Sequence, residues 1–290
     1  MSDHARTSDT SGNTAPESVD SKPFRLRHEP WVKFQQSLDA MLDPVGEAAL
    51  ARLAPKRGEV VLDVGCGCGT TTFALAEMVG STGTVIGVDI SAPMLEVARS
   101  EALARGTTNV EFVLGDAGTH PFSPDHFDVI YSRLGTMFFD EPGAAFANLN
   151  RILRPGGRFG SVVWRTLAEN QWSNAPRNAV TSIFPALEQP LDRPGPFSLG
   201  DRPTLSATLK EAGFVDVDIE PHDEPLLVGQ GDMDTAIRFY LELLPSGYLM
   251  VEADRRQADR MKALLRTELE RHQSDNGIWM GSATWIALAR

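Results

Sequence analysis

The strongest constraint on the fold is an alternation of short apolar runs with longer segments of helical character. Each run is bounded by glycine or by polar turn residues, as expected for a strand buried within a sheet; the five runs are 60–64, 84–89, 110–114, 127–131 and 158–164. The segments between them predict helices at 70–79, 93–104 and 142–153. Strands that alternate with helices form right-handed βαβ units around a parallel sheet with helices on both faces. We therefore expect an α/β fold.

The residues before the first strand are expected to form a disordered tail followed by a helical segment. Residues 1–23 are rich in Ser, Thr, Asp, Gly and Pro and contain no aromatic residue, which predicts a disordered tail. The remaining residues, 24–290, are expected to form one domain, in which 24–55 supply a helical cover. We predict two helices in this cover, one along the apolar stripe from Trp31 to Leu42 and one at 45–53, after Pro44.

The strand–helix rhythm stops at residues 165–200, where five prolines predict little regular structure. A helix at 203–212 and a strand at 214–219 resume the pattern. A charged helix at about 251–271 then precedes a last strand at 282–289. We expect two insertions, 165–200 and 225–275, to cover the substrate.

Composition excludes several classes of function. The chain has 27 Lys and Arg against 39 Asp and Glu, a formal net charge of −12, which disfavours binding to nucleic-acid phosphates. No apolar run approaches the roughly 18 residues of a membrane span, and the N-terminus lacks the apolar core of a secretory signal. The two cysteines, Cys66 and Cys68, are too few for a disulfide framework. We expect a cytoplasmic protein.

A glycine-rich loop follows the first strand, in which Gly65, Gly67 and Gly69 alternate with the two cysteines. Glycines permit a sharp turn and the close approach of a ligand to the backbone. Open α/β sheets bind nucleotides at such a loop, beyond the carboxyl ends of the strands. The NAD pattern Gly-x-Gly-x-x-Gly is not met, because Thr70 stands at its sixth position. A Cys-x-Cys metal site would need further ligands nearby, and none is present, so we expect no metal.

Carboxylates accompany this loop. Asp89 ends the second strand 20 residues beyond Gly69, the spacing at which an acidic side chain accepts hydrogen bonds from ribose hydroxyls. Asp116 ends the third strand, where its carboxylate can accept from an adenine amino group. Asp63, two residues before Gly65, favours a ligand that carries a cation over one that carries a pyrophosphate. These residues predict a nucleoside site at one edge of the sheet.

Together these motifs resemble those of class I S-adenosylmethionine-dependent methyltransferases, in particular the quinone-biosynthesis branch. The similarity rests on segments 61–67, 87–95, 115–128 and 153–157; it covers residues 30–165 closely and extends to 212–214. It implies S-adenosylmethionine as the cofactor and a Rossmann-like sheet of seven strands. In that fold the sheet is mostly parallel and the last two strands, here 214–219 and 282–289, form an antiparallel hairpin.

The resemblance also implies roles for individual residues. The set implied to bind the cofactor is Asp63, Gly65, Cys66, Gly67, Gly69, Asp89, Ile90, Met94, Asp116, Ala117 and Ser132. The loop glycines would lie along the methionine part, with Asp63 near its amino group. Asp89 would hold the ribose, Ile90 and Met94 would flank the adenine, and Asp116 would bind its amino group. Ser132 would face the sulfonium.

Two residues are candidates for catalysis. His120 is either a general base near the transferred methyl group or a packing residue, and Arg133 binds either a substrate carboxylate or a backbone carbonyl. Aromatic residues gather in the segments expected to cover the site, which favours a small, partly apolar metabolite. We therefore predict methyl transfer to an oxygen, nitrogen or carbon atom of such a metabolite.

Two other functions stay open from the residues alone. One is a Rossmann-like enzyme that uses a different nucleotide, and the other is a non-catalytic S-adenosylmethionine-binding sensor or scaffold. The sequence does not identify the acceptor, and it does not distinguish a monomer from a homodimer.

Overall fold

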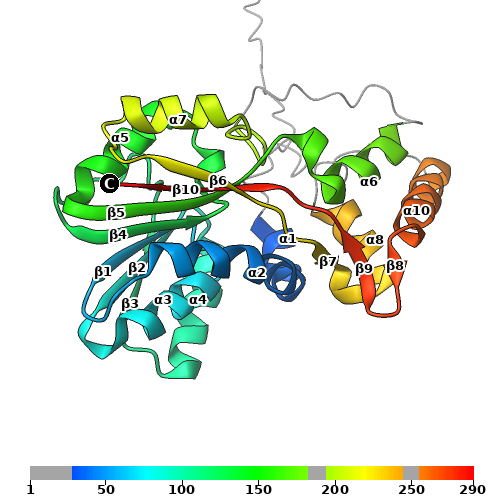
Figure 1. The fold of residues 1–290 in the computed structure, drawn as a ribbon. Helices are drawn as coiled ribbons and strands as arrows, with labels where there is room; N and C mark the ends of the chain where they lie inside the picture. The colour runs from blue at the N-terminus through cyan, green and yellow to red at the C-terminus, as the bar shows by residue number, and fades with distance from the viewer. Residues whose placement is uncertain (1–27, 182–193, 244–254) are drawn as a thin grey trace, which may run out of the picture.

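The computed structural model describes residues 28–181, 194–243 and 255–290. Its centre is a seven-stranded sheet with the order β3-β2-β1-β4-β5-β10-β6 (Figure 1). The strands are β1 (Val60–Val64), β2 (Thr84–Asp89), β3 (Val110–Leu114), β4 (Phe127–Arg133), β5 (Leu153–Trp164), β6 (Asp218–His222) and β10 (Thr284–Ala289). Strands β1 to β5 pair in parallel, and β10 runs antiparallel to both β5 and β6. The predicted α/β class and mostly parallel sheet are confirmed.

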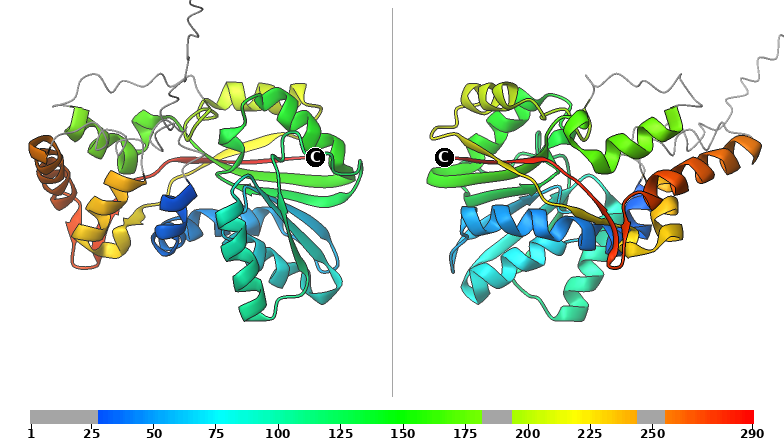
Figure 2. Two further views of the ribbon diagram at one scale, coloured as in Figure 1. Left: turned by 180° about the vertical axis from the view of Figure 1, so that it is seen from behind. Right: turned by 45° about the vertical axis from the view of Figure 1, so that its right-hand side comes forward.

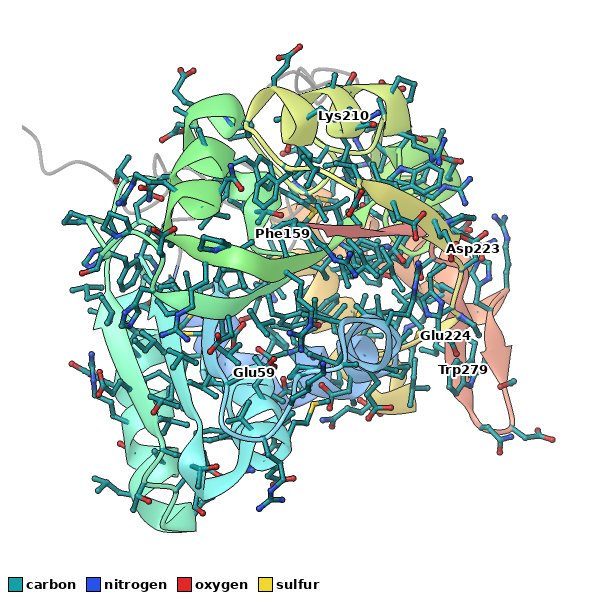
Figure 3. All side chains as sticks on the ribbon, turned by 60° about the vertical axis from the view of Figure 1, so that its left-hand side comes forward. Glu59, Phe159, Lys210, Asp223, Glu224 and Trp279 are labelled. Carbon is teal, nitrogen blue, oxygen red and sulfur yellow. The ribbon has the colours of Figure 1, made fainter. Side chains whose placement is uncertain are left out.

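Helices cover both faces of this sheet. They are α1 (His28–Lys33), α2 (Gln35–Leu53), α3 (Thr70–Val79), α4 (Ala92–Arg105), α5 (Pro142–Ile152) and α7 (Arg202–Glu211). Helices α2, α3 and α4 lie on one face, and α5 and α7 lie on the other (Figures 1 and 2). Phe159 of β5 (labelled in Figure 3) is fully buried, and its ring centroid lies 5.8 Å from that of Phe146 on α5 and 5.1 Å from that of Phe214, which follows α7. This packing holds the central strands in place beneath the site.

A second lobe stands beyond the carboxyl ends of the parallel strands (Figures 1 and 2). It contains α6 (Gln171–Thr181), α8 (Met233–Glu242), α10 (Arg255–Glu270) and a small antiparallel sheet of β7 (Leu226–Val228), β9 (Gly277–Met280) and β8 (Gln273–Ser274). Short 3₁₀ turns occur at η3 (Gly80–Thr82), η4 (Thr136–Phe138), η5 (Leu167–Glu169) and η7 (Gly229–Gly231). Within the three described ranges, no helix is both long and apolar enough to cross a membrane.

The cover before β1 contains two helices, but the break between them lies at Phe34 and not at Pro44 as predicted, because α2 continues through Pro44. Proline lacks the amide that would donate one helical hydrogen bond, which usually ends or kinks a helix. Here Met41, Val45 and Ala49 on either side of it are all buried in the core. Their packing keeps the helix continuous. The predicted tail at 1–23 lies outside the described residues.

The expectation of little regular structure at 165–200 is wrong in its described part. Helix α6 occupies 171–181 and contains Pro176, which is buried on the same face as Trp172 and Val180. The number of prolines does not reveal that such a face exists. Smaller differences concern β6, which begins four residues later than predicted, and β5, which begins at Leu153 and not at residue 158.

Strands β6 and β10 form the predicted antiparallel pair, but no tight turn joins them. The chain between them, 223–283, leaves the central sheet, contributes α8, α10 and the small sheet to the second lobe, and returns. A third connection between the central sheet and the second lobe is the chain segment from β5 to α6. The second lobe is therefore attached to the central sheet through several chain segments, beside the edge where the site is expected.

Candidate functional site

A cavity of about 250 Å³ opens between the carboxyl ends of the central strands, helices α1 and α2, and the second lobe. The residues implied for the site that line it are Gly65, Cys66, Gly67, Asp89, Ile90, Met94, Asp116, Ala117 and Arg133. Those that do not line it are Asp63, Gly69, His120 and Ser132. The structure thus gathers residues from four strand ends around one space, with a second set directly behind them.

The glycine loop approaches the turn after β4 very closely. Gly65 and Gly67 have φ angles of 70° and 56°, in the left-handed region that favours glycine. A Cβ atom on Gly65 would lie 2.9 Å from the Cα atom of Gly135, and one on Gly67 would lie 2.9 Å from Cε of Met94. The backbone conformation favours glycine at both positions, and at Gly65 the backbone of Gly135 adds a second reason, whereas the flexible end of Met94 can move away from residue 67.

Asp89 joins this loop to the start of α4. Its Oδ2 accepts a hydrogen bond from the Gly67 amide at 2.9 Å, and its Oδ1 accepts one from the Ser91 amide at 2.8 Å. Burial raises the pKa of Asp89, and the two amide bonds oppose that rise. Each carboxylate oxygen has a further lone pair. The group that holds the loop can therefore also accept hydrogen bonds from a ligand in the cavity.

Asp63 lies behind the loop and is fully buried. Its Oδ2 accepts hydrogen bonds from the hydroxyls of Thr71 and Thr72 at 2.6 and 2.7 Å, while Oδ1 has no hydrogen-bond partner in the part of the chain that is described. Burial raises the pKa of Asp63. Asp63 therefore anchors the first turn of α3 from outside the cavity wall, and its predicted place near a bound amino group stays a prediction.

We expect Asp63→Asn to change the pH dependence of stability. A folded pKa above the unfolded value of 3.8 means that protonation favours the folded state, so this contribution is present below about pH 3.8 and is lost as pH rises through the folded pKa. Asparagine does not titrate. The stability of the variant relative to the original chain should therefore increase between pH 4 and pH 7. Urea unfolding at both values measures it, and a constant difference would contradict the prediction.

Ser132 is also fully buried, and it connects two strand ends. Its hydroxyl donates to the Val64 carbonyl at 2.9 Å and accepts from the Gly135 amide at 3.2 Å. Gly69, with a φ angle of 93°, begins α3 and packs against Phe73. Both residues support the cavity wall from behind, and their predicted places beside the cofactor stay predictions.

Asp116 and His120 belong to one turn but face different surroundings. Oδ1 of Asp116 accepts from the Gly118 amide at 2.8 Å, and this side chain lines the cavity. The His120 ring turns away, packs 4.3 Å from the ring centroid of Phe122, and lies next to Gly115. These contacts favour the packing alternative for His120, and the general-base alternative stays a prediction.

We expect His120→Ala to leave affinity for S-adenosylmethionine within about threefold, because the ring contributes nothing to the cavity wall. Loss of the contact with Phe122 should cost about 1 kcal/mol of stability. Calorimetric titration and thermal unfolding measure the two effects. A fall in turnover of a hundredfold at unchanged affinity would restore the general-base role.

Arg133 lines the cavity, but its partners differ from both predicted alternatives. Its Nη1 lies 2.6 Å from Oδ1 of Asp43, and its Nη2 lies 3.5 Å from Oδ1 of Asp39, both on α2. Asp39 also lines the cavity, accepts from Gln35 at 3.4 Å, and has a pKa that burial raises. Sequence reasoning missed this group. The spacing of 35, 39 and 43 places all three on one helix face, which is the signal that reveals them.

A second set of lining residues, called here the apolar half of the cavity, is aromatic or aliphatic. Its walls are formed by Trp31, Leu38, Met137, Phe138, Phe139, Trp164, Trp172, Pro196, Phe239 and Leu243. These residues come from the helical cover, the turn after β4, the end of β5 and the second lobe. Trp164 and Phe239 were missed from the sequence. Trp164 is the last residue of β5, at the same edge of the sheet as the polar residues, whereas Phe239 reaches the cavity only through the packing of the second lobe against the sheet.

Comparison with known proteins identifies the family. A methyltransferase-domain model matches residues 55–186. Nocamycin O-methyltransferase of Saccharothrix syringae is 33% identical over 236 residues, which cover 74% of this chain and 80% of that protein. The chain belongs to this methyltransferase family. It is an S-adenosylmethionine-dependent methyltransferase, as the motifs predict.

Two further comparisons agree with this assignment. The ubiquinone/menaquinone biosynthesis C-methyltransferase UbiE of Pseudomonas aeruginosa is 32% identical over 169 residues, covering 55% of this chain and 66% of that protein. The YcgJ protein of Bacillus subtilis shares the fold, with a TM-score of 0.56 at 20% identity over 85% of this methyltransferase and 97% of that chain. None of these matches favours the other nucleotide-dependent enzyme or the sensor.

Proposed function

We propose that this methyltransferase transfers the methyl group of S-adenosylmethionine to a small, partly apolar metabolite bound in the same cavity. The observation that carries the proposal is the division of the cavity into two unlike halves. One half consists of the glycine loop and the carboxylates at the strand ends. The other half is walled by aromatic and aliphatic side chains. The two halves are continuous, so a cofactor in the first would face an acceptor in the second.

The polar half suits the cofactor. In this assignment Asp89 accepts hydrogen bonds from the ribose, Asp116 and the backbone of Ala117 bind the adenine amino edge, and Ile90 and Met94 flank the adenine ring. The backbone around Gly65, Cys66 and Gly67 lies along the methionine part, supported from behind by Asp63, Gly69 and Ser132. The positive φ angles and the absence of Cβ atoms in the loop leave room for this approach.

The apolar half suits the acceptor. S-adenosylmethionine supplies the electrophilic methyl group when bound. The chain's own part is to hold the attacking atom about 3 Å from that methyl group and opposite the sulfur, an orientation that contributes at most roughly 7–11 kcal/mol. The aromatic walls exclude water from the reacting atoms. We further propose that 24–55, 165–200 and 225–275 form the cover, since α1, α2, α6 and α8 all supply wall residues.

We also propose a cytoplasmic setting and a small-molecule rather than nucleic-acid acceptor. The net charge of −12 supports the second point, because a phosphate backbone would be repelled. Both cysteines are unpaired, which suits a reducing compartment.

Calorimetric titration with S-adenosylmethionine, S-adenosylhomocysteine and NAD tests the cofactor half of the proposal. We expect micromolar affinity for both sulfur compounds and none for NAD. A panel of small acceptors, with mass spectrometric detection of methylated product and S-adenosylhomocysteine, tests the other half. Failure to bind either sulfur compound would overturn the site assignment, whereas binding without turnover on any acceptor would favour a sensor.

A further inference from the structure

One wall of the apolar half is a tryptophan that the second lobe brings against the central sheet. Trp172, in the first turn of α6, is 4% exposed and lines the cavity. Its ring centroid lies 4.9 Å from that of Trp164 at the end of β5, with the planes at 45°. Phe239 of α8 lines the same part of the cavity. Two indoles from different lobes therefore meet at the place where the acceptor is proposed to bind.

Trp172 is fixed by its polar groups as well as by packing. Its amide donates to the Gly281 carbonyl at 3.1 Å, and its own carbonyl accepts from the hydroxyl of Tyr240 at 2.6 Å. The indole Nε1–H donates to Oδ1 of Asn170 at 3.1 Å. Three separate segments of the chain thus hold Trp172, and the bond to Asn170 sets the orientation of the ring.

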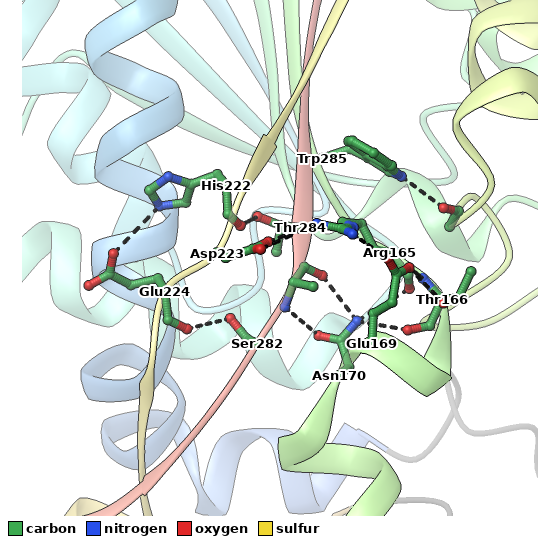
Figure 4. Close-up of polar contacts among 12 residues, drawn as sticks. Arg165, Thr166, Glu169, Asn170, His222, Asp223, Glu224, Ser282, Thr284 and Trp285 are labelled. Carbon is green, nitrogen blue, oxygen red and sulfur yellow. Dashed lines mark hydrogen bonds and ion pairs between the residues drawn. The ribbon is translucent and has the colours of Figure 1, made fainter.

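Asn170 anchors the indole through a fully buried amide. Its Oδ1 also accepts from the Ala283 amide at 2.9 Å, and its Nδ2 donates to the carbonyls of Ala283 and Thr166 at 3.0 and 3.1 Å (Figure 4). Ala283 directly precedes β10, and Thr166 follows β5. Because every polar atom of this side chain is bonded, it behaves as a rigid bracket between the two crossing segments.

At Trp172 this arrangement leaves an acceptor only an apolar ring to contact. The single polar atom of the indole is already bonded to Asn170, so Trp172 has no donor to offer a ligand. The guanidinium of Arg133, on the cavity wall, is already paired with Asp43 and Asp39. A flat, immobile indole beside a second indole binds a planar ring by offset or edge contact, at little cost in conformational entropy.

We propose that Trp172 is a specificity-determining residue that selects acceptors with a planar aromatic ring, and that Asn170 is the positioning residue that orients it. The inference rests on the proposed function, because it requires that the acceptor occupy the apolar half of the cavity. It adds a property that the proposed function leaves open, namely discrimination between planar aromatic acceptors and saturated ones of the same size.

The test uses a matched pair of probes, 2-naphthol and its saturated counterpart decahydro-2-naphthol, titrated into the full chain saturated with S-adenosylhomocysteine. We expect the original chain to bind the planar probe about tenfold more tightly. Trp172→Leu should remove this preference while changing affinity for decahydro-2-naphthol and for S-adenosylhomocysteine by less than twofold. Trp172→Phe, which keeps an aromatic ring, should retain most of the preference.

A matched control is Trp285→Leu. Trp285 is a partly buried tryptophan on β10 whose indole donates to Gly200, and it does not line the cavity. In the Trp285→Leu variant, the affinities for 2-naphthol, decahydro-2-naphthol and S-adenosylhomocysteine should be unchanged. Asn170→Ala should weaken 2-naphthol binding about threefold on its own and have no further effect in the Trp172→Leu background, because it acts through the indole. Additive losses would show a purely structural role for Asn170.

Two outcomes would overturn the inference: no preference for 2-naphthol in the original chain, or a preference that survives in Trp172→Leu. If thermal unfolding shows that the leucine variant does not fold, Trp172→Met provides the same comparison with an unbranched side chain. Failure of the original chain to bind S-adenosylhomocysteine would instead contradict the proposed function itself.

Discussion

Alanine in place of Asp89 should weaken S-adenosylmethionine binding by about a hundredfold. The carboxylate holds the amides of Gly67 and Ser91, and in the proposed assignment it also accepts from the ribose. A hydrogen bond to a charged group contributes roughly 1.5–3 kcal/mol, so loss of the ribose contact alone accounts for about tenfold. Release of the loop at Gly67 also removes the preformed cavity wall, and this accounts for the rest of the hundredfold loss of affinity. Calorimetric titration measures the change.

Two further variants make this result specific. Asp89→Asn keeps one acceptor oxygen, so its affinity should fall between those of the original chain and the alanine variant. Glu77→Ala removes a carboxylate from the exposed side of α3, outside the cavity, and should leave the affinity for S-adenosylmethionine unchanged. If Asp89→Ala remained folded and bound the cofactor within threefold of the original chain, the assignment of the polar half would be wrong.

The polar half of the cavity could be predicted because its signals are local in sequence. Gly65, Asp89 and Asp116 each stand at the end of a buried strand or within two residues of it, which places them at the carboxyl edge of a parallel sheet, whatever the rest of the chain does. The bounds predicted for β1, β2, β3 and α3 agree with the structure for this reason. The prediction was weaker for residues that lie behind this edge. Nothing in the sequence shows that the Asp63 side chain turns toward α3 or that the Ser132 side chain turns toward Val64.

The apolar half could not be predicted because its contacts join distant segments. Asn170 bonds to Ala283, 113 residues away, and Arg133 pairs with Asp43, 90 residues away. Pro176 suggested an irregular segment, but the burial of Trp172 on one face of α6 depends on partners that only tertiary packing supplies. The motifs therefore identify the cofactor and the family, while the acceptor is defined by side chains that no local pattern brings together.

Alanine at Gly65 should both destabilise the chain and disrupt the cavity. The φ angle of 70° costs an L-residue about 1–2 kcal/mol. The new Cβ would also meet the Cα atom of Gly135 at 2.9 Å, and because that atom belongs to the backbone the contact cannot be relieved by a side-chain rotation. Overpacking of this kind costs about 1–3 kcal/mol, so the free energy of unfolding should fall by roughly 2–5 kcal/mol. Urea denaturation measures it.

Substitutions at two other glycines distinguish the cost of the positive φ angle from the cost of overpacking. Gly106 has a φ angle of 66° but open space around its Cβ position, so Gly106→Ala should show only the conformational cost of about 1–2 kcal/mol. Gly143, in the first turn of α5, has neither a positive φ angle nor a neighbour within 4 Å, so alanine there should be neutral or slightly stabilising. Equal losses at Gly65 and Gly106 would mean that the loop moves away from Gly135 at no cost. In that case the close approach of the loop to the turn after β4 would not be what shapes the cofactor half of the cavity.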